Sequence, residues 1–138
     1  MGRKTNEDVN NFDLLRTDGV HTDLACGGVG IVYTQTYICP KDVTFGFEWK
    51  FTSSGVILAS IAIEQGSIDP IVQGAADANF VVPDGVGNLV TNTADALVHI
   101  KPFAPTVCNF LRVRVTTAGA NDASTVLERF IVHTIVNA

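Results

Sequence analysis

This chain of 138 residues is short of cysteine, of charge and of long apolar runs. Its 3 cysteines, Cys26, Cys39 and Cys108, form no C-x-x-C motif and have no histidine at metal-ligand spacing. We therefore expect buried thiols in a reducing compartment and no metal. No segment approaches the roughly 18 apolar residues of a membrane helix, and residues 1–11 contain no apolar leader core. These absences predict a soluble protein without a membrane partner.

Charge is scarce and predominantly negative. Charged residues make up 17% of the chain, where about 25% is usual. The 9 Lys and Arg against 14 Asp and Glu leave a formal net charge of -5, which argues against a nucleic-acid partner. Hydrophobic residues account for 46% of the chain. A surface so poor in charge favours cover by another subunit, although a monomeric sandwich rich in Gly and Thr would have a similar composition.

The sequence contains no enzyme signature. The motifs H-x-H, H-E-x-x-H and G-x-S-x-G are absent, and His21, His99 and His133 lie far apart, the last two among strand-like residues. A paired-carboxylate hydrolase needs two acids facing one cleft, which Glu48 and Glu64 could supply. Each of them instead interrupts an apolar alternation, so we expect both to face solvent. The sequence predicts a non-enzymatic protein with no catalytic residues and no cofactor.

The connection over residues 66–95 contains candidate Ca²⁺ ligands, which are Asp69, Asp77, Asp84 and Asp95. They lack the regular spacing of a dedicated calcium loop. Asp and Asn side chains also cap turns and tolerate unusual backbone angles. We therefore expect an irregular connection without a metal.

Strand signals dominate from residue 20 onward. The clearest lies at residues 43–51, VTFGFEWKF, where every second residue is apolar and the residues between are Thr44, Gly46, Glu48 and Lys50. This alternation predicts a strand with one dry face and one wet face. The other predicted strands cover residues 30–38, 56–65, 96–103, 109–117 and 125–136, with short strands near 80–82 and 89–91.

The segment at residues 56–65, VILASIAIEQ, is apolar on both faces of the predicted strand. Ile57, Ile61 and Ile63 would lie on one face, and Leu58 and Ala62 on the other. A strand of a simple sandwich buries one face, so this strand must be covered twice, by an arm, a loop or another subunit. A helix is the rival interpretation, but the β-branched residues and flanking turn residues favour a strand.

These patterns predict an all-β fold. About seven to nine short strands in one domain are typical of an antiparallel β-sandwich, and we expect one of jelly-roll type. Residues 20–138 would form this single domain. Residues 1–19 are polar and mixed in charge, with few apolar anchors, so we expect a flexible N-terminal arm.

The last two predicted strands contain Arg112, Arg114 and Arg129, and the small residues AGANDA between them predict a hairpin. Arg112 and Arg114 would share one face, about 7 Å apart. A sheet that binds nucleic acid also needs stacking aromatics, and only Phe110 shares that face. Pairing with acids such as Glu128, in the same sheet or in a neighbouring subunit, is favoured. The three arginines are therefore candidate subunit-interface residues.

A ligand-binding sandwich is the alternative. Carbohydrate-binding modules present a flat strip of two or three Trp or Tyr side chains, whereas this chain has one Trp, Trp49, on the core-like face of its strand. Tyr33 and Tyr37 lie four residues apart on one predicted strand. A platform of two tyrosines therefore stays open.

The segment PFAPTVCNFLRVRVTTAGANDASTVLERFIV, residues 102–132, has a proline-marked approach, a strand that alternates aliphatic residues with two arginines, a small-residue turn and a terminal apolar strand. It resembles the closing hairpin of small jelly-roll structural proteins of tailed-phage virions. The resemblance implies a capsid decoration or cement protein whose trimers bind the major capsid protein and stabilise the shell. It also implies assembly in the host cytoplasm and a final location in the virion. The alternative is a carbohydrate- or ligand-binding module, including a phage fibre or tail component.

Overall fold

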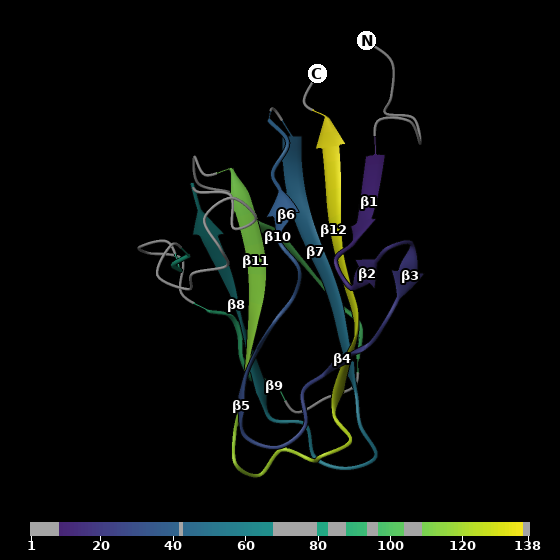
Figure 1. The fold of residues 1–138 in the computed structure, drawn as a ribbon, viewed down its shortest axis with the longest axis vertical. Helices are drawn as coiled ribbons and strands as arrows, with labels where there is room; N and C mark the ends of the chain where they lie inside the picture. The colour runs from purple at the N-terminus through teal and green to yellow at the C-terminus, as the bar shows by residue number, and fades with distance from the viewer. Residues whose placement is uncertain are drawn as a thin grey trace.

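The computed structural model describes residues 9–41, 43–67, 80–82, 88–93, 97–103 and 109–136 (Figure 1). All regular elements in these ranges are β-strands, and the strands pair antiparallel. The predicted all-β sandwich is therefore confirmed. The same ranges hold no helix with the length and apolarity needed to cross a membrane.

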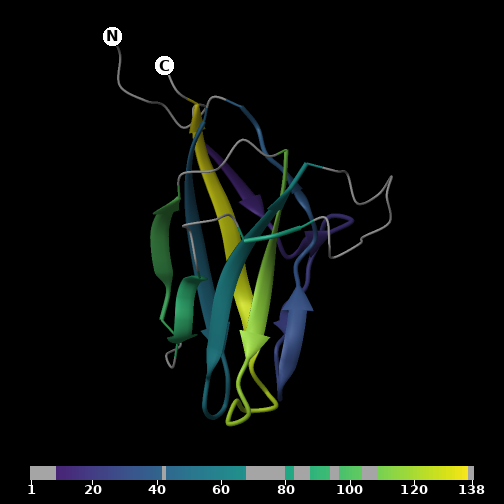
Figure 2. The same ribbon diagram turned by 90° about the vertical axis from the view of Figure 1, so that its left-hand side faces the viewer.

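The strands form two main sheets that pack face to face (Figures 1 and 2). Sheet I contains, in spatial order, β1 (Val9–Asp13), β12 (Val126–Val136), β7 (Val43–Thr52) and β10 (His99–Phe103), with β4 (Leu24–Ala25) also paired to β12. Sheet II contains β5 (Gly30–Tyr33), β11 (Phe110–Thr117), β8 (Ala59–Gly66) and β9 (Asn88–Thr93), with β6 (Tyr37–Ile38) also paired to β11. A separate small hairpin consists of β2 (Arg16–Thr17) and β3 (Val20–His21).

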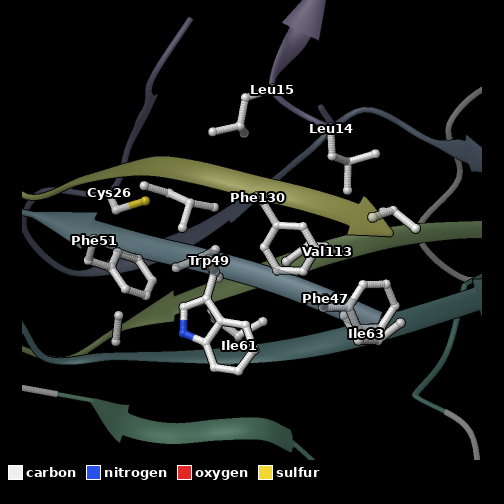
Figure 3. Close-up of a cluster of buried hydrophobic side chains, with 14 of the residues drawn as sticks. Leu14, Leu15, Cys26, Phe47, Trp49, Phe51, Ile61, Ile63, Val113 and Phe130 are labelled. Atoms are coloured by element: carbon white, nitrogen blue, oxygen red, sulfur yellow. The ribbon is translucent and has the colours of Figure 1, made fainter. Parts of the chain in front are cut away.

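The two sheets enclose a core that the alternation of β7 predicted correctly. Phe45, Phe47, Trp49 and Phe51 are all buried. Figure 3 shows Phe47, Trp49 and Phe51 in one cluster with Ile61 and Ile63 of β8, Val113 of β11 and Phe130 of β12. The Phe47 and Phe130 ring centroids are 5.5 Å apart. Each fully buried large side chain contributes roughly 1.5–3 kcal/mol of transfer free energy, so this inner face is the main source of stability.

The pairing of the last two strands differs from the predicted hairpin. β11 pairs with β8 and β5 in sheet II, whereas β12 pairs with β7 and β1 in sheet I. The segment between them is therefore an arch that crosses from one sheet to the other. The prediction was wrong because alternation fixes which face of a strand is buried and leaves its pairing partner undetermined.

The N-terminal segment also differs from the prediction. Residues 9–13 form β1 on the edge of β12, and Leu14 and Leu15 are buried in the core, so the predicted flexible arm is wrong for residues 9–15. The Phe12 ring packs 5.0 Å from the Tyr37 ring. A strand on a sheet edge needs few apolar residues, which is why its sequence resembled an arm. Residues 1–8 of the predicted arm lie outside the described residues.

Two arches lie at one end of the sandwich, the β7–β8 connection and the β11–β12 connection (Figure 1). Asn121 bonds them to each other. The Leu58 backbone N–H donates to Asn121 Oδ1 at 2.9 Å, and Asn121 Nδ2 donates to the Cys26 carbonyl at 2.7 Å. The Asn121 side chain is buried. Nearby, a Cβ at Gly27 would lie 2.2 Å from the Ala123 carbonyl oxygen, so only glycine fits there. The connector AGANDA is thus bonded to the segments around Cys26 and Leu58, which are distant from it in sequence.

We predict that Asn121→Ala lowers the free energy of unfolding by about 2–4 kcal/mol, because a buried N–H and a buried carbonyl both lose their partner. Urea denaturation followed by circular dichroism measures the change. Ala120→Ser, at the exposed neighbouring position, is the control and should change stability by less than about 0.5 kcal/mol. Equal stability of the two variants would contradict the bridging role of Asn121.

Candidate functional site

The outer face of sheet II carries a buried ionic cluster. Arg112 and Arg114 point outward from β11, as predicted, and both meet Glu64 on β8. Arg112 Nε donates to Glu64 Oε1 at 2.8 Å, and Arg114 Nη1 donates to Glu64 Oε2 at 2.9 Å. Glu64 is only 3% exposed, so its predicted solvent-facing position is wrong. The two arginines pair with an acid in their own sheet, which is one of the two predicted arrangements.

Two aromatic rings cover the guanidinium of Arg112. Its central carbon lies 4.0 Å from the Tyr33 ring centroid and 4.5 Å from the Phe80 ring centroid. Phe80 is held there because the next residue, Val81, exchanges two backbone hydrogen bonds with Gln65, at 2.9 and 3.1 Å. We call Tyr33, Glu64, Phe80, Arg112 and Arg114 the arginine cluster.

The arginine cluster explains why β8 is buried on both faces. Ala62 and Glu64 point outward, away from the core, and both are buried. The cover includes the segment containing Phe80 and the Arg112 side chain, so a loop of the same chain supplies part of it. The sequence predicted that an arm, a loop or another subunit covers the second face of β8. Within the described residues, a loop supplies part of that cover.

The chemistry of the arginine cluster is structural. One carboxylate lies between two guanidiniums, and its two oxygens each accept a hydrogen bond, so it is not placed to act as a base. The side chain of Arg112 is 6% exposed, whereas that of Arg114 is 31% exposed. The cluster joins β8 to β11 and leaves Arg114 as the cation at the surface.

Exposed apolar side chains flank the arginine cluster on the same face. Ile31 lies opposite Thr116 and Ile38 lies opposite Phe110, both on the outward side of sheet II. Their exposed fractions are 54% and 71%. We call Ile31, Ile38, Phe110 and Arg114 the sheet II patch. Ile31 and Ile38 lie near opposite ends of β11 on this face, and the partly exposed Arg114 lies between them.

The third predicted arginine, Arg129, lies on the opposite face of the sandwich. Its Nη1 donates to Glu48 Oε2 at 2.7 Å, and His133 Nε2 lies 2.9 Å from Glu48 Oε1. The three arginines therefore belong to two separate surfaces. Glu128 pairs with Lys50 on β7, at 3.5 Å, instead of with Arg112 or Arg114, because β12 is not in their sheet.

The pKa of Glu48 lies below its ordinary value. Burial alone would raise it, but the hydrogen bonds from His133 and Arg129 outweigh burial. Glu48 points outward from β7, as the alternation predicted, yet its side chain is only 13% exposed. His133 and His99 are both strand residues, as predicted, and the His99 ring stacks 5.4 Å from the Trp49 ring.

A surface depression of about 640 Å³ surrounds His21, and the sequence analysis missed it. His21 Nδ1 lies 2.6 Å from Asp13 Oδ2, and His21 Nε2 lies 3.0 Å from Asp23 Oδ1. The hydrogen bond to Asp13, followed by that to Asp23, raises the pKa of His21. The β2–β3 turn, with Asp18 and Gly19 at positive φ, places His21 beside Asp13. The Asp-Gly pair between two short strands was the available signal.

The two-tyrosine platform that the sequence left open is not formed by Tyr33 and Tyr37. Tyr33 faces outward over Arg112. Tyr37 is buried and contacts the rings of Phe12 and Phe45. The two side chains therefore do not share a surface. Tyr33 and Tyr37, on which the sugar-binding interpretation was based, do not form a flat binding strip.

The thiols have different surroundings. Cys26 is buried, which raises its pKa to about 11, and Cys39 is partly exposed. Cys108 and the four candidate Ca²⁺ ligands, Asp69, Asp77, Asp84 and Asp95, lie outside the described residues. Within the described ranges, no three His, Cys, Asp or Glu side chains are grouped so that they could hold a metal ion.

Comparison with known proteins gives no relative. No protein-family model, no curated protein and no solved structure matches this chain. Its function is therefore argued from the surfaces described above.

We predict that Arg112→Met lowers the free energy of unfolding by about 3 kcal/mol, because Glu64 stays buried after losing one of its two cations. Chemical denaturation measures this. Arg129→Met is the matched control, since that guanidinium is 39% exposed, and it should cost less than about 1 kcal/mol. If Arg112→Met were as mild as the control, the Glu64 pair would not support the sheet.

We also predict that Glu48 contributes to acid sensitivity. Because its folded pKa is lowered from 4.5, its stabilising contribution is present above pH 4.5 and is lost as the pH falls through the folded value. As the pH falls below 4.5, the Glu48→Gln variant should therefore lose less stability than the wild type. Thermal unfolding at stepped pH values measures this difference. Asp18→Asn, at an exposed turn, should keep the wild-type slope. Parallel curves for Glu48→Gln and the wild type would refute the prediction.

Proposed function

We propose that this chain is a non-enzymatic structural protein that forms a homo-oligomer, a trimer in the simplest case, and acts in a virion. In that role it decorates the capsid, binds the major capsid protein and stabilises the shell after assembly in the host cytoplasm.

The observation that carries the proposal is the sheet II patch. Ile31 on β5 and Ile38 on β6 lie along the same outer face of sheet II, where both strands pair with β11, and both side chains are more than half exposed. Exposed apolar groups that gather on one face mark interaction surfaces, because water contact with them is unfavourable. The partly exposed Arg114 supplies a polar group that can orient a partner.

The use of charge supports a structural role. Glu64, Glu48 and Glu128 each bind a cation on a neighbouring strand of their own sheet. Such cross-strand pairs stabilise a sheet. These three carboxylates are therefore engaged within the sheets.

The strand pairing supports the jelly-roll part of the proposal. β1 pairs with β12, β5 with β11, β7 with β10 and β8 with β9. These pairs are nested: the first of the eight strands pairs with the last, the second with the second from last, and so on inward. A jelly roll can be described as one long antiparallel ribbon rolled into two sheets, so this nested pairing supports the jelly-roll proposal. In such a roll the last two strands lie in opposite sheets, as β11 and β12 do. The resemblance of residues 102–132 to phage structural proteins agrees with this topology.

We expect size-exclusion chromatography with light scattering to give a trimer at micromolar concentration. The double variant Ile31→Lys/Ile38→Lys should weaken association at least about tenfold, because two cations would enter an apolar contact. Circular dichroism checks that the variant stays folded. Detection of the chain in purified particles by mass spectrometry tests its location.

Val20→Lys is the matched control, since Val20 is 62% exposed on the separate β2–β3 hairpin. It should leave the trimer unchanged. A clean wild-type monomer at micromolar concentration would refute assembly, and a double variant that associates as tightly as the control would exclude the sheet II patch.

A further inference from the structure

The arginine cluster carries one positive charge in excess. Arg112 and Arg114 share a single carboxylate, Glu64, and each of its oxygens accepts from one guanidinium. Arg112 is buried between two rings, so the excess charge lies on Arg114, whose side chain is 31% exposed. Within the described residues, Arg114 Nε is buried and has no hydrogen-bond partner. The outer face of sheet II therefore presents a cation to a partner that covers it.

Arg114 lies between the two exposed isoleucines of the sheet II patch. Ile38 pairs with Phe110 and Ile31 pairs with Thr116, and Arg114 stands between these two positions on β11. An isologous interface joins a surface to itself, so a twofold contact centred on this patch would place the Arg114 side chains of two copies against each other. Like charges at close range repel. The patch therefore suits a contact with a different surface of the next copy.

The outer face of sheet I offers such a surface on the opposite side of the sandwich. Ile100 pairs with Glu48 across β10 and β7, and Pro102 pairs with Gly46. Because paired residues share a face and Glu48 points outward, Ile100 and Pro102 point outward as well. Ile100 is 70% exposed, and Val98, just before the strand, is 45% exposed. We call Val98, Ile100 and Pro102 the β10 row.

The β10 row and Glu48 complement the sheet II patch. Both surfaces carry exposed aliphatic side chains that can cover each other. Glu48 is 13% exposed, and a carboxylate has about four lone-pair sites, so its contacts with Arg129 and His133 leave room for a donor such as Arg114. Copies that each carry a net charge of -5 repel one another. A contact that pairs an excess cation with a carboxylate offsets this repulsion.

We propose that the copies associate head to tail, with the sheet II patch of one copy seated on the β10 row of the next. This inference rests on the proposed function and adds the surface that the sheet II patch binds. The two surfaces lie on different sheets and face away from each other, so every copy in a ring uses both. Such heterologous contacts close into a ring when the rotation between copies closes, and a trimer is the proposed case.

Mixing two variants tests this pairing. Ile31→Lys/Ile38→Lys disrupts the sheet II patch and Ile100→Lys disrupts the β10 row, so each should weaken self-association at least about tenfold. In a mixture, the intact β10 row of the first variant can meet the intact sheet II patch of the second. We expect native mass spectrometry to show a one-to-one dimer that neither variant forms alone. The concentration is raised about tenfold, because a single contact lacks the closure of a ring.

Circular dichroism checks that the variants stay folded, and Val98→Lys is a second variant of the β10 row with the same expected result. Val29→Lys is the matched control, since Val29 is 73% exposed and lies between β4 and β5, outside both surfaces. It should leave association unchanged.

The outcomes separate this inference from the proposed function. A wild-type monomer would refute both. A wild-type trimer that Ile100→Lys and Val98→Lys leave as tight as the control, or a mixture of the two disrupted variants that stays monomeric, would overturn the head-to-tail contact alone.

Discussion

The packing of the inner face of β7 against β8 and β11 is the constraint on which the rest of this structure depends. Four buried aromatic side chains on β7 need a second apolar sheet above them, and that sheet must carry small and β-branched side chains to fill the space between the rings. β8 and β11 meet this need with isoleucine and valine. Both connections, from β7 to β8 and from β11 to β12, then have to cross the core as arches. The hydrogen bonds of Asn121 hold the two arches together at the end of the sandwich.

The outer face of sheet II has a second, smaller core. Burying Glu64 would be costly for a lone carboxylate, but two guanidiniums neutralise it and two rings cover the nearer guanidinium. This arrangement converts a charged face into a largely dry one. Ile31 and Ile38 remain exposed on either side of this cluster, and we locate the proposed contact between subunits there.

The outer face of sheet I uses charge differently. Glu48, Arg129 and His133 form a chain of hydrogen bonds across β7 and β12 that reaches β1 through Asn11. These groups are partly exposed, so each bond is individually weak. One sheet therefore buries most of its charged network, whereas the other leaves its network partly exposed where the N-terminal segment attaches.

The sequence by itself determined which residues face the core and which face outward. Alternation placed Phe47 and Val113 inside and Arg112, Arg114 and Glu48 outside, because side chains on a strand change face at every residue whatever strand lies beside them. Only the tertiary structure decided which strands are neighbours. It joined Arg112 to Glu64 instead of Glu128, turned a predicted hairpin into an arch and drew residues 9–15 into the sandwich. It also brought Asp13 to His21. Strand pairing is a long-range choice made by the whole core, and no local pattern in the sequence encodes it.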